Sequence, residues 1–329
     1  MQKQQIEAQK KDITDSIRYA SDIQAAILPK EEEIQSFLPH SFVLFKPKDI
    51  VSGDFYWFHA SPALRKESFG PALPDSVPPI ALAVAQGKGN PHAGAPLHSV
   101  SSEARGGGLI FLAVCDCTGH GVPGAFVSMV GNDLLNQIII EKEILNPAEV
   151  LSLLNMGMNS VFLRTKAEQH SNADTVSANR SSENPSGQNW GSEIKDGMYM
   201  VLCTFNDDLS KLEFAGARNP LYYVRDGILT EIKGDKHPIG GRTDLNCIFT
   251  KHELNLQKGD TIYMFSDGYA DQLGGPREKK FMAKNIKQLL LNINDKELNE
   301  QKQILDRTNN EWKGGMDQID DIVIIGVKI

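Results

Sequence analysis

The most constraining feature of this chain is a continuous apolar segment that runs directly into a glycine-rich turn. Residues 109–115 (LIFLAVC) are apolar and of strand length, and DCTGHGVPG follows at 116–124. Residues 122–141 then have helical spacing, with Pro123 suitably placed for a first helical turn. The pattern predicts a buried strand that delivers Asp116 to the start of a helix.

Apolar, β-branched and aromatic segments predict short strands along much of the chain. We expect strands at 41–47, 54–58, 198–205, 211–215, 221–225, 228–232, 248–254, 261–266 and 322–329. Further helices are expected at 147–164, 278–294 and 297–309. Because strands and helices come in blocks, the order favours a layered α+β fold over alternating β-α-β units.

Residues 1–28 are interpreted as a separate amphipathic helix, and residues 29–329 as the main domain. Residues 3–28 lack Gly and Pro, and Pro29 ends the helical pattern. Apolar residues recur every seven positions at Ile6, Ile13, Ala20 and Ile27. The interleaved seam contains polar residues such as Gln24, so we expect a connecting helix or a weak coiled coil that continues a longer upstream segment.

Two segments with the composition of loops interrupt the predicted domain. Residues 59–108 hold 7 of the 16 prolines, and residues 165–196 are rich in Ser and Asn. The first segment separates two predicted strands by far more residues than a hairpin needs. We expect both segments to be loop insertions.

Charge and hydropathy argue against two classes of function. Lys and Arg number 34 against 42 Asp and Glu, and the net charge of −8 argues against a nucleic-acid partner. The apolar runs are shorter than the roughly 20 residues that a membrane span needs, and no secretory signal follows Met1. We therefore expect a cytoplasmic protein. Its four cysteines form no CxxC pair, which favours structural thiols.

The residues that indicate chemistry are aspartates at the ends of predicted strands. They are Asp54, Asp116, Asp267, and Asp320 with its neighbour Asp321. Several carboxylates without a set of His or Cys residues suit magnesium or manganese better than zinc. Taken singly, each aspartate is also a common turn residue, and the hypothesis of a metal site depends on their joint occurrence.

The ordered motifs of the chain resemble those of a known family. QAAILP, VSGDF, DCTGHGVPGAF, FAGARNPLYYV, MFSDGYAD and DDIVII occur in that order. Together they are similar to the SpoIIE-like branch of the PPM-type, metal-dependent protein serine/threonine phosphatases. The resemblance covers roughly residues 20–58, 109–164 and 197–329.

The resemblance implies a four-layer αββα sandwich of two antiparallel sheets flanked by helices, with two manganese or magnesium ions at one edge. Asp116 would bridge both ions, and the carbonyl of Cys117 would bind the first. Asp54 would bind the first ion directly or through water, while Asp267 and Asp320 would hold the second. Asp321 is less suited, because neighbouring residues of a strand point to opposite faces.

Three further residues are candidates for handling the substrate. By the same resemblance, a hydroxide activated by the two ions attacks phosphorus, and His120 is the nearest candidate to supply the leaving group with a proton. A turn histidine that caps the following helix is the alternative. Arg218, where the family often has His, and Asn219 are candidate substrate residues, although a solvated hairpin arginine explains Arg218 as well.

The function implied is hydrolysis of phosphoserine or phosphothreonine on a protein, in a bacterial partner-switching pathway whose usual substrate is an anti-sigma factor antagonist. The N-terminal helix would couple the domain to an upstream sensor or to a second copy. One alternative is a non-catalytic scaffold that binds a phosphoprotein, and another is a small-molecule phosphohydrolase. A nucleophile-type hydrolase is disfavoured because GxSxG is absent.

Overall fold

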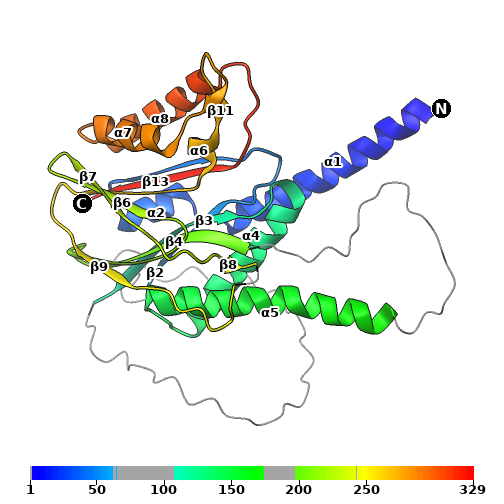
Figure 1. Cartoon of the computed structure of the whole chain (residues 1–329), viewed down its shortest axis with the longest axis horizontal. Coiled ribbons are helices and arrows are strands. Elements are labelled where there is room, and N and C mark those ends of the chain that lie inside the picture. Colours follow the sequence, from blue (N-terminus) through cyan, green and yellow to red (C-terminus); the bar gives the residue numbers. More distant parts are fainter. Residues whose placement is uncertain (1, 62–63, 65–106, 174–196, 242) are drawn as a thin grey trace, which may run out of the picture.

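Two antiparallel sheets lie face to face at the centre of the chain (Figure 1). The computed structural model describes residues 2–61, 64, 107–173, 197–241 and 243–329. The first sheet contains, in spatial order, β1 (Ser41–Lys46), β13 (Ile322–Lys328), β10 (Thr261–Phe265), β6 (Leu221–Arg225) and β7 (Ile228–Ile232). The second contains β2 (Phe55–Ala60), β3 (Leu109–Cys117), β4 (Gly197–Asn206), β5 (Lys211–Ala217) and β9 (His252–Asn255), with β8 (Ile239–Gly240) beside β4.

Helices cover both outer faces of the pair of sheets (Figure 1). The second sheet is covered by α4 (Gly121–Leu135), the π-helical η2 (Asn136–Glu141) and α5 (Pro147–Ala173). The first sheet is covered by α6 (Gly268–Asp271), α7 (Ala283–Ile293) and α8 (Leu298–Lys313). The helices α1 (Gln2–Ile27) and α2 (Glu31–Phe37) precede the sheets, and β11 (Leu273–Gly274) pairs with β12 (Lys279–Lys280) in a small hairpin.

Alternation of side chains along each strand explains the layers. In β3, Ile110, Leu112 and Val114 are buried between the sheets, where they join Val323 and Ile325 of β13. The intervening β3 residues face the other way and pack with α4 and α5. Because β3 is buried on both faces, it is a continuous apolar run rather than an alternating one. This arrangement confirms the expected αββα sandwich.

The outer face of the first sheet is buried by helix side chains at helical spacing. Ile324 of β13 and Tyr263 of β10 belong to the same core as Ile286, Leu290 and Leu305 from α7 and α8. Ile286 and Leu290 are four residues apart, so they lie on one face of α7. The buried Tyr263 hydroxyl donates to Oε1 of Gln301 at 2.7 Å, which places a polar partner inside this otherwise apolar layer.

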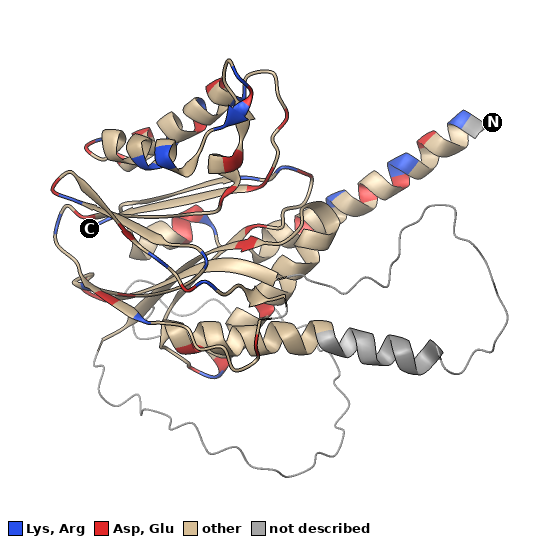
Figure 2. Cartoon of the chain, viewed as in Figure 1, with Lys and Arg blue, Asp and Glu red and all other residues tan. Residues whose placement is uncertain are grey.

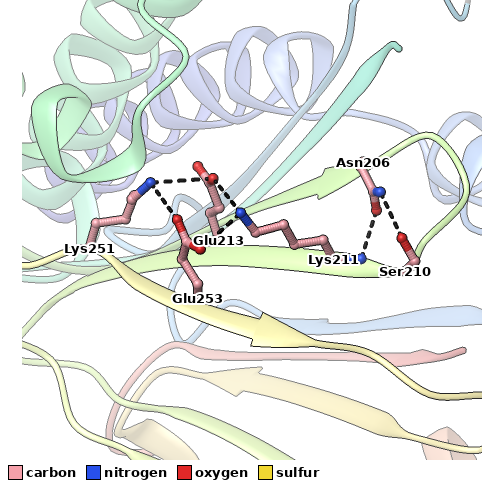
Figure 3. Close-up of polar contacts among 6 residues, drawn as sticks. All are labelled: Asn206, Ser210, Lys211, Glu213, Lys251 and Glu253. Atoms are coloured by element: carbon pink, nitrogen blue, oxygen red, sulfur yellow. Dashed lines mark hydrogen bonds and ion pairs between the residues drawn. The ribbon is translucent and has the colours of Figure 1, made fainter. Parts of the chain in front are cut away.

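An ion-pair network joins β5 to the edge strand β9 (Figure 3). Lys251 lies 2.7 Å from Glu253 and 3.3 Å from Glu213, while Lys211 lies 2.9 Å from Glu253. Glu213 is only 3% exposed, so both lysines offset the burial of its charge. Charged side chains of this kind also discourage a further strand from pairing with the edge.

Helix α1 packs against the domain only near its C-terminal end. Ile6 is 60% exposed and Ile13 is 62% exposed, although both belong to the seven-residue apolar repeat. Figure 1 shows the N-terminal part of α1 projecting away from the sheets, and Figure 2 shows basic and acidic residues interspersed along it. The apolar repeat therefore does not form a core within a single chain.

Gln24 is the point where α1 is anchored to the domain. It is 4% exposed, and its Nε2 donates to the Ser52 carbonyl at 2.6 Å and to Ser128 Oγ on α4 at 2.9 Å. Its Oε1 accepts a hydrogen bond from the Ser52 N–H at 2.9 Å. The heptad pattern identifies Gln24 only as a polar seam position. In the structure its buried amide connects α1, the Ser52 loop and α4.

Several predicted elements have different ends in the structure. The helix expected at 122–141 changes at Asn136 to π-helical η2, and the helix expected at 147–164 extends to Ala173. The strand expected at 248–254 begins later in the structure, as β9 (His252–Asn255). The Thr250 N–H donates to Asp235 Oδ2 rather than to a neighbouring strand. The helix expected from 278 begins at Ala283, since Met282 has a φ of +78°.

The two predicted insertions fall mostly outside the described residues. The first insertion was expected to begin at residue 59, but His59 and Ala60 belong to β2 and pair with β3. The second overlaps the end of α5. Among the described helices, none has the length and apolar character needed to cross a membrane. All four cysteines are free thiols, and Cys115, Cys117 and Cys203 are buried.

We predict that Gln24→Ala lowers the free energy of unfolding by about 1–3 kcal/mol, because buried groups of Ser52 and Ser128 lose their partner. Urea denaturation followed by circular dichroism measures the change. Gln9→Ala, on the exposed part of the same helix, is the matched control and should stay within about 0.5 kcal/mol of the native chain. Equal effects of the two substitutions would contradict the anchoring role.

Candidate metal centre

Four strand ends, two from each sheet, bring aspartates to one edge of the sandwich. Asp54 directly precedes β2, and Asp116 lies near the end of β3. Ser266 separates Asp267 from the end of β10, and Asp321 separates Asp320 from the start of β13. The Asp267 N–H donates to Asp116 Oδ2 at 3.4 Å, a long contact that joins the two sheets at this point. The structure therefore brings all four predicted carboxylates together.

Burial and mutual repulsion raise the pKa of the two inner carboxylates. Asp54 is 4% exposed, and burial, followed by the nearby charge of Asp116, raises its pKa well above the usual range. A hydrogen bond from Ser266 partly opposes this shift. Burial and then the charge of Asp267 likewise raise the pKa of Asp116 well above the usual range. Both residues therefore carry a negative charge only against an electrostatic cost.

The two outer carboxylates show the same tendency. Burial, and then the charges of Asp320 and Asp271, raise the pKa of Asp267 to about 6. Burial also raises the pKa of Asp320, while the charges of Lys48 and His120 oppose the shift. Protein crowds Asp267 on one side while the residue stays open to solvent on the other, so water screens part of the repulsion that acts on it.

The chemistry of this cluster fits hard divalent cations. In the part of the chain that the structure describes, no Lys or Arg forms an ion pair with any of the four aspartates. Nor do three His, Cys, Asp or Glu side chains among these residues converge into a complete coordination group. Magnesium typically keeps several waters and binds only one or two carboxylates directly, so these strand-end oxygens suit it without a full protein cage.

Asp321 anchors the loop that carries Asp54. It is 1% exposed, its Oδ1 accepts from the Lys48 N–H at 2.7 Å, and its Oδ2 accepts from the Gly53 N–H at 2.7 Å. A weaker contact at 3.4 Å reaches the Asp54 N–H. Asp321 therefore uses its oxygens on backbone donors, whereas the half-buried Asp320 remains at the cluster. Alternation of faces along a strand makes Asp321 the less suited ligand of the pair, but only the structure supplies its backbone partners.

Glycines allow the loops of the site to pack without side chains between them. A Cβ at Gly53 or at Gly124 would collide with the carbonyl oxygen of Gly119. A Cβ at Gly268, next to Asp267, would collide with the carbonyl oxygen of Asp321. The strand ends that carry the aspartates are therefore held together by direct backbone contact.

Cys117 takes part in this packing through its backbone. Its side chain is 5% exposed in the core below α4, and burial raises the pKa of the thiol well above its usual value. Its carbonyl oxygen lies 3.5 Å from the position that a Cβ would take at Gly53. The carbonyl is thus beside the loop that carries Asp54, and its role as a metal ligand stays a prediction.

His120 lies at the rim and pairs with a residue that sequence reasoning did not identify. Its Nδ1 is 2.8 Å from Asp49 Oδ2, and both side chains are about half exposed. His120 occupies the position before α4 but makes no side-chain capping hydrogen bond, so the capping interpretation is wrong. Asp49 precedes Asp54 in the same turn, and only the tertiary structure brings it to His120.

Arg218 and Asn219 lie beside the aspartate cluster rather than in it. Both are in the connection from β5 to β6. The Arg218 guanidinium lies over the ring of Tyr199, 5.3 Å from its centre, and Tyr199 is the β4 partner of Asp116. Asn219 is 9% exposed. Strand β4 pairs with β3, which carries Asp116, and the two predicted substrate residues follow β5, the next strand of the same sheet.

Comparison with known proteins decides the family. A profile of the family described as Stage II sporulation protein E (SpoIIE) matches residues 106–329. The chain belongs to the SpoIIE family. A search of curated protein sequences returned no significant match.

Solved structures place this SpoIIE family member among the PP2C-type (PPM) phosphatases. The SiaA-PP2C domain of Pseudomonas aeruginosa is 26% identical, with a TM-score of 0.68 over 98% of this chain and 99% of that chain. The PP2C phosphatase domain of SpoIIE from Bacillus subtilis, solved with a fragment of its regulatory domain, is 16% identical, with a TM-score of 0.52 over 88% of this chain and 62% of that chain. The expected fold and family are confirmed.

We predict that, without divalent cations, the chain becomes less stable as the pH rises from about 4 through about 6. The raised pKa values mean that the folded chain binds more protons than the unfolded chain in this window, so stability falls as those protons leave. Melting temperatures in EDTA measure the slope, and Asp116→Asn should make it shallower. Identical slopes in both proteins would contradict this origin.

Asp320→Asn and Asp321→Asn should have opposite consequences. Asp321→Asn replaces one of two backbone-accepting oxygens, so we expect it to lower the free energy of unfolding by about 1–3 kcal/mol in EDTA. Asp320→Asn relieves repulsion and should leave that stability unchanged or higher, while it weakens manganese binding in calorimetry. A larger loss of stability in Asp320→Asn would show that the two roles are assigned in reverse.

Proposed function

We propose that this chain is a metal-dependent phosphatase that hydrolyses phosphoserine or phosphothreonine on a protein. The observation that carries the proposal is the set of four strand-end aspartates, contributed by both sheets, whose pKa values burial and mutual repulsion raise. The PP2C-type fold and membership of the SpoIIE family support it. Repulsion among these carboxylates supports the proposal, because bound cations would relieve it.

The resemblance to the family supplies the residues that would hold two manganese or magnesium ions. Asp116 would be shared, the Cys117 carbonyl and Asp54 would serve the first ion, and Asp267 and Asp320 the second; the contact between Asp116 and the Asp267 N–H supports this grouping. When bound, such ions supply activation of water and charge neutralisation for phosphoryl transfer. Asp321 keeps the Asp54 loop in place through its bonds to the backbone.

His120 would serve the leaving group. Because Nδ1 faces Asp49 at 2.8 Å, Nε2 is the ring atom left to hold the proton that the departing serine or threonine oxygen takes up. The Asp49 carboxylate fixes the orientation of the imidazole through this contact. The half exposure of both side chains places this pair at the mouth of the site, where a protein substrate would approach.

The partners belong to the same proposal. We infer a phosphoprotein substrate, of the kind that anti-sigma factor antagonists represent in partner-switching systems, since the chain belongs to the SpoIIE family. Residues 1–28 would act as a separate coupling helix, and the exposed Ile6 and Ile13 would pack against an upstream sensor or a second copy. Gln24 connects that helix to the Asp54 loop and to α4.

The retained aspartates distinguish catalysis from the scaffold alternative. A phosphoprotein-binding scaffold gains nothing from buried carboxylates that repel one another, whereas a metal-dependent enzyme requires them. All four positions are occupied by Asp in this chain. We therefore favour the enzyme over a non-catalytic scaffold.

We predict manganese-dependent hydrolysis of p-nitrophenyl phosphate by the native chain, and a decrease of about 100-fold or more in kcat for Asp116→Asn and Asp267→Asn, because each removes a ligand oxygen. Initial rates across a manganese titration measure this. Asp295→Asn, an exposed aspartate between α7 and α8, is the matched control. Metal-independent turnover, or equal loss in the control, would overturn the proposed site.

A further inference from the structure

A pocket of about 330 Å³ lies beside the candidate metal centre. Its walls come from the β5–β6 connection, through Arg218 and Pro220, and from the end of β7 and the segment after it, residues 231 and 233–236. The volume is within the range of small-ligand sites. Five of its seven lining residues are charged, so a charged occupant suits it better than a wholly apolar one.

The charges of this pocket favour an anion. Arg218, Lys233 and Lys236 line it together with Glu231 and Asp235. Both acids already have partners: Glu231 pairs with Lys287 of α7, and the Asp235 carboxylate accepts from the Thr250 N–H at 2.6 Å and from its Oγ1 at 3.0 Å. Within the described residues, neither Lys233 nor Lys236 forms an ion pair, so their charges remain available to a ligand.

The pocket wall is rigid. The Arg218 N–H donates to the Asp235 carbonyl at 2.8 Å, and the Asp235 N–H donates to the Gly216 carbonyl at 2.8 Å, so the two connections are tied together. Arg218 has a φ of +66°, a left-handed conformation that non-glycine residues rarely adopt outside turns and functional sites. Its guanidinium is held over the Tyr199 ring. The cations are therefore presented from a fixed backbone.

The position of the pocket relates it to the reacting phosphate. Asp116 pairs with Tyr199 of β4, and the next pair along the sheet joins Met200 to Ala217 of β5, directly before Arg218. Arg218 is thus two strands from Asp116, a separation of roughly 10 Å. An extended peptide covers that distance in about three residues, at about 3.3 Å each.

We propose that this pocket binds an acidic side chain of the substrate protein, located about three residues from the phosphorylated serine or threonine. The inference rests on the proposed phosphatase function and adds a specificity site to it. A carboxylate there would contact Lys233 and Lys236 beside the Arg218 guanidinium, whose Nη1 already donates to the Lys236 carbonyl at 3.4 Å. Substrates with Glu or Asp at this distance would bind more tightly than neutral ones, and the effect would appear in KM.

The test compares two synthetic phosphoserine peptides, one with Glu three residues before and three residues after the phosphoserine, the other with Gln at both positions. We expect kcat/KM to be about tenfold higher for the Glu peptide in the native chain, through a lower KM. The double variant Lys233→Gln/Lys236→Gln should lose that preference. Lys258→Gln, an exposed lysine before β10 at the opposite end of that strand from Asp267, should keep it.

Binding separates failure of this inference from failure of the proposed function. Equal kcat/KM for the two peptides in the native chain, or a preference that survives in the double variant, would overturn the acidic-residue pocket while the phosphatase assignment stands. If neither peptide nor p-nitrophenyl phosphate is hydrolysed, fluorescence anisotropy of the labelled peptides decides instead. Tighter binding of the Glu peptide that the double variant loses supports the pocket, and equal binding of both peptides rejects it.

Discussion

Repulsion among carboxylates at the shared edge of two sheets is the constraint on which the rest of the structure depends. Asp54 is buried and Asp116 is half-buried, and burial together with the charges of neighbouring aspartates raises the pKa of both. Such a cluster is costly in isolation and becomes favourable when divalent cations bind. The fold must therefore hold the aspartates together against a force that separates them.

Backbone contacts and buried hydrogen bonds supply that restraint. Asp321 accepts hydrogen bonds from the loop before Asp54, and Gly268 lets the turn after Asp267 touch the backbone of Asp321. Gln24 adds a connection from α1 to the Asp54 loop and to α4. The same buried amide therefore ties the position of α1 to the loop that precedes Asp54.

Much of the fold and the members of the candidate site could be predicted from the sequence. The continuous apolar run of β3 and the glycine-rich turn after it are local patterns, and so are the aspartates that end successive strands. Less local features were missed. Asp49 faces His120 and Arg218 lies over Tyr199 only because segments distant in the chain meet there. The start of one helix also differs from the prediction: Met282 has a left-handed backbone conformation, and α7 begins only after it.

The sequence pattern by itself indicated a layered α+β fold, because strands of alternating or continuous apolar character can be buried in only a few ways. The resemblance of its motifs to a known family then narrowed this to the αββα sandwich. The sequence also determined which aspartates lie at strand ends. Only the tertiary structure decided what each one contacts: Asp321 accepts from the N–H groups of Lys48 and Gly53, Asp320 accepts from the Asp321 N–H, and Gln24 is buried rather than exposed on a coiled-coil seam. The reason is physical, since hydrogen-bond partners and electrostatic neighbours depend on distances in space, which sequence spacing does not specify.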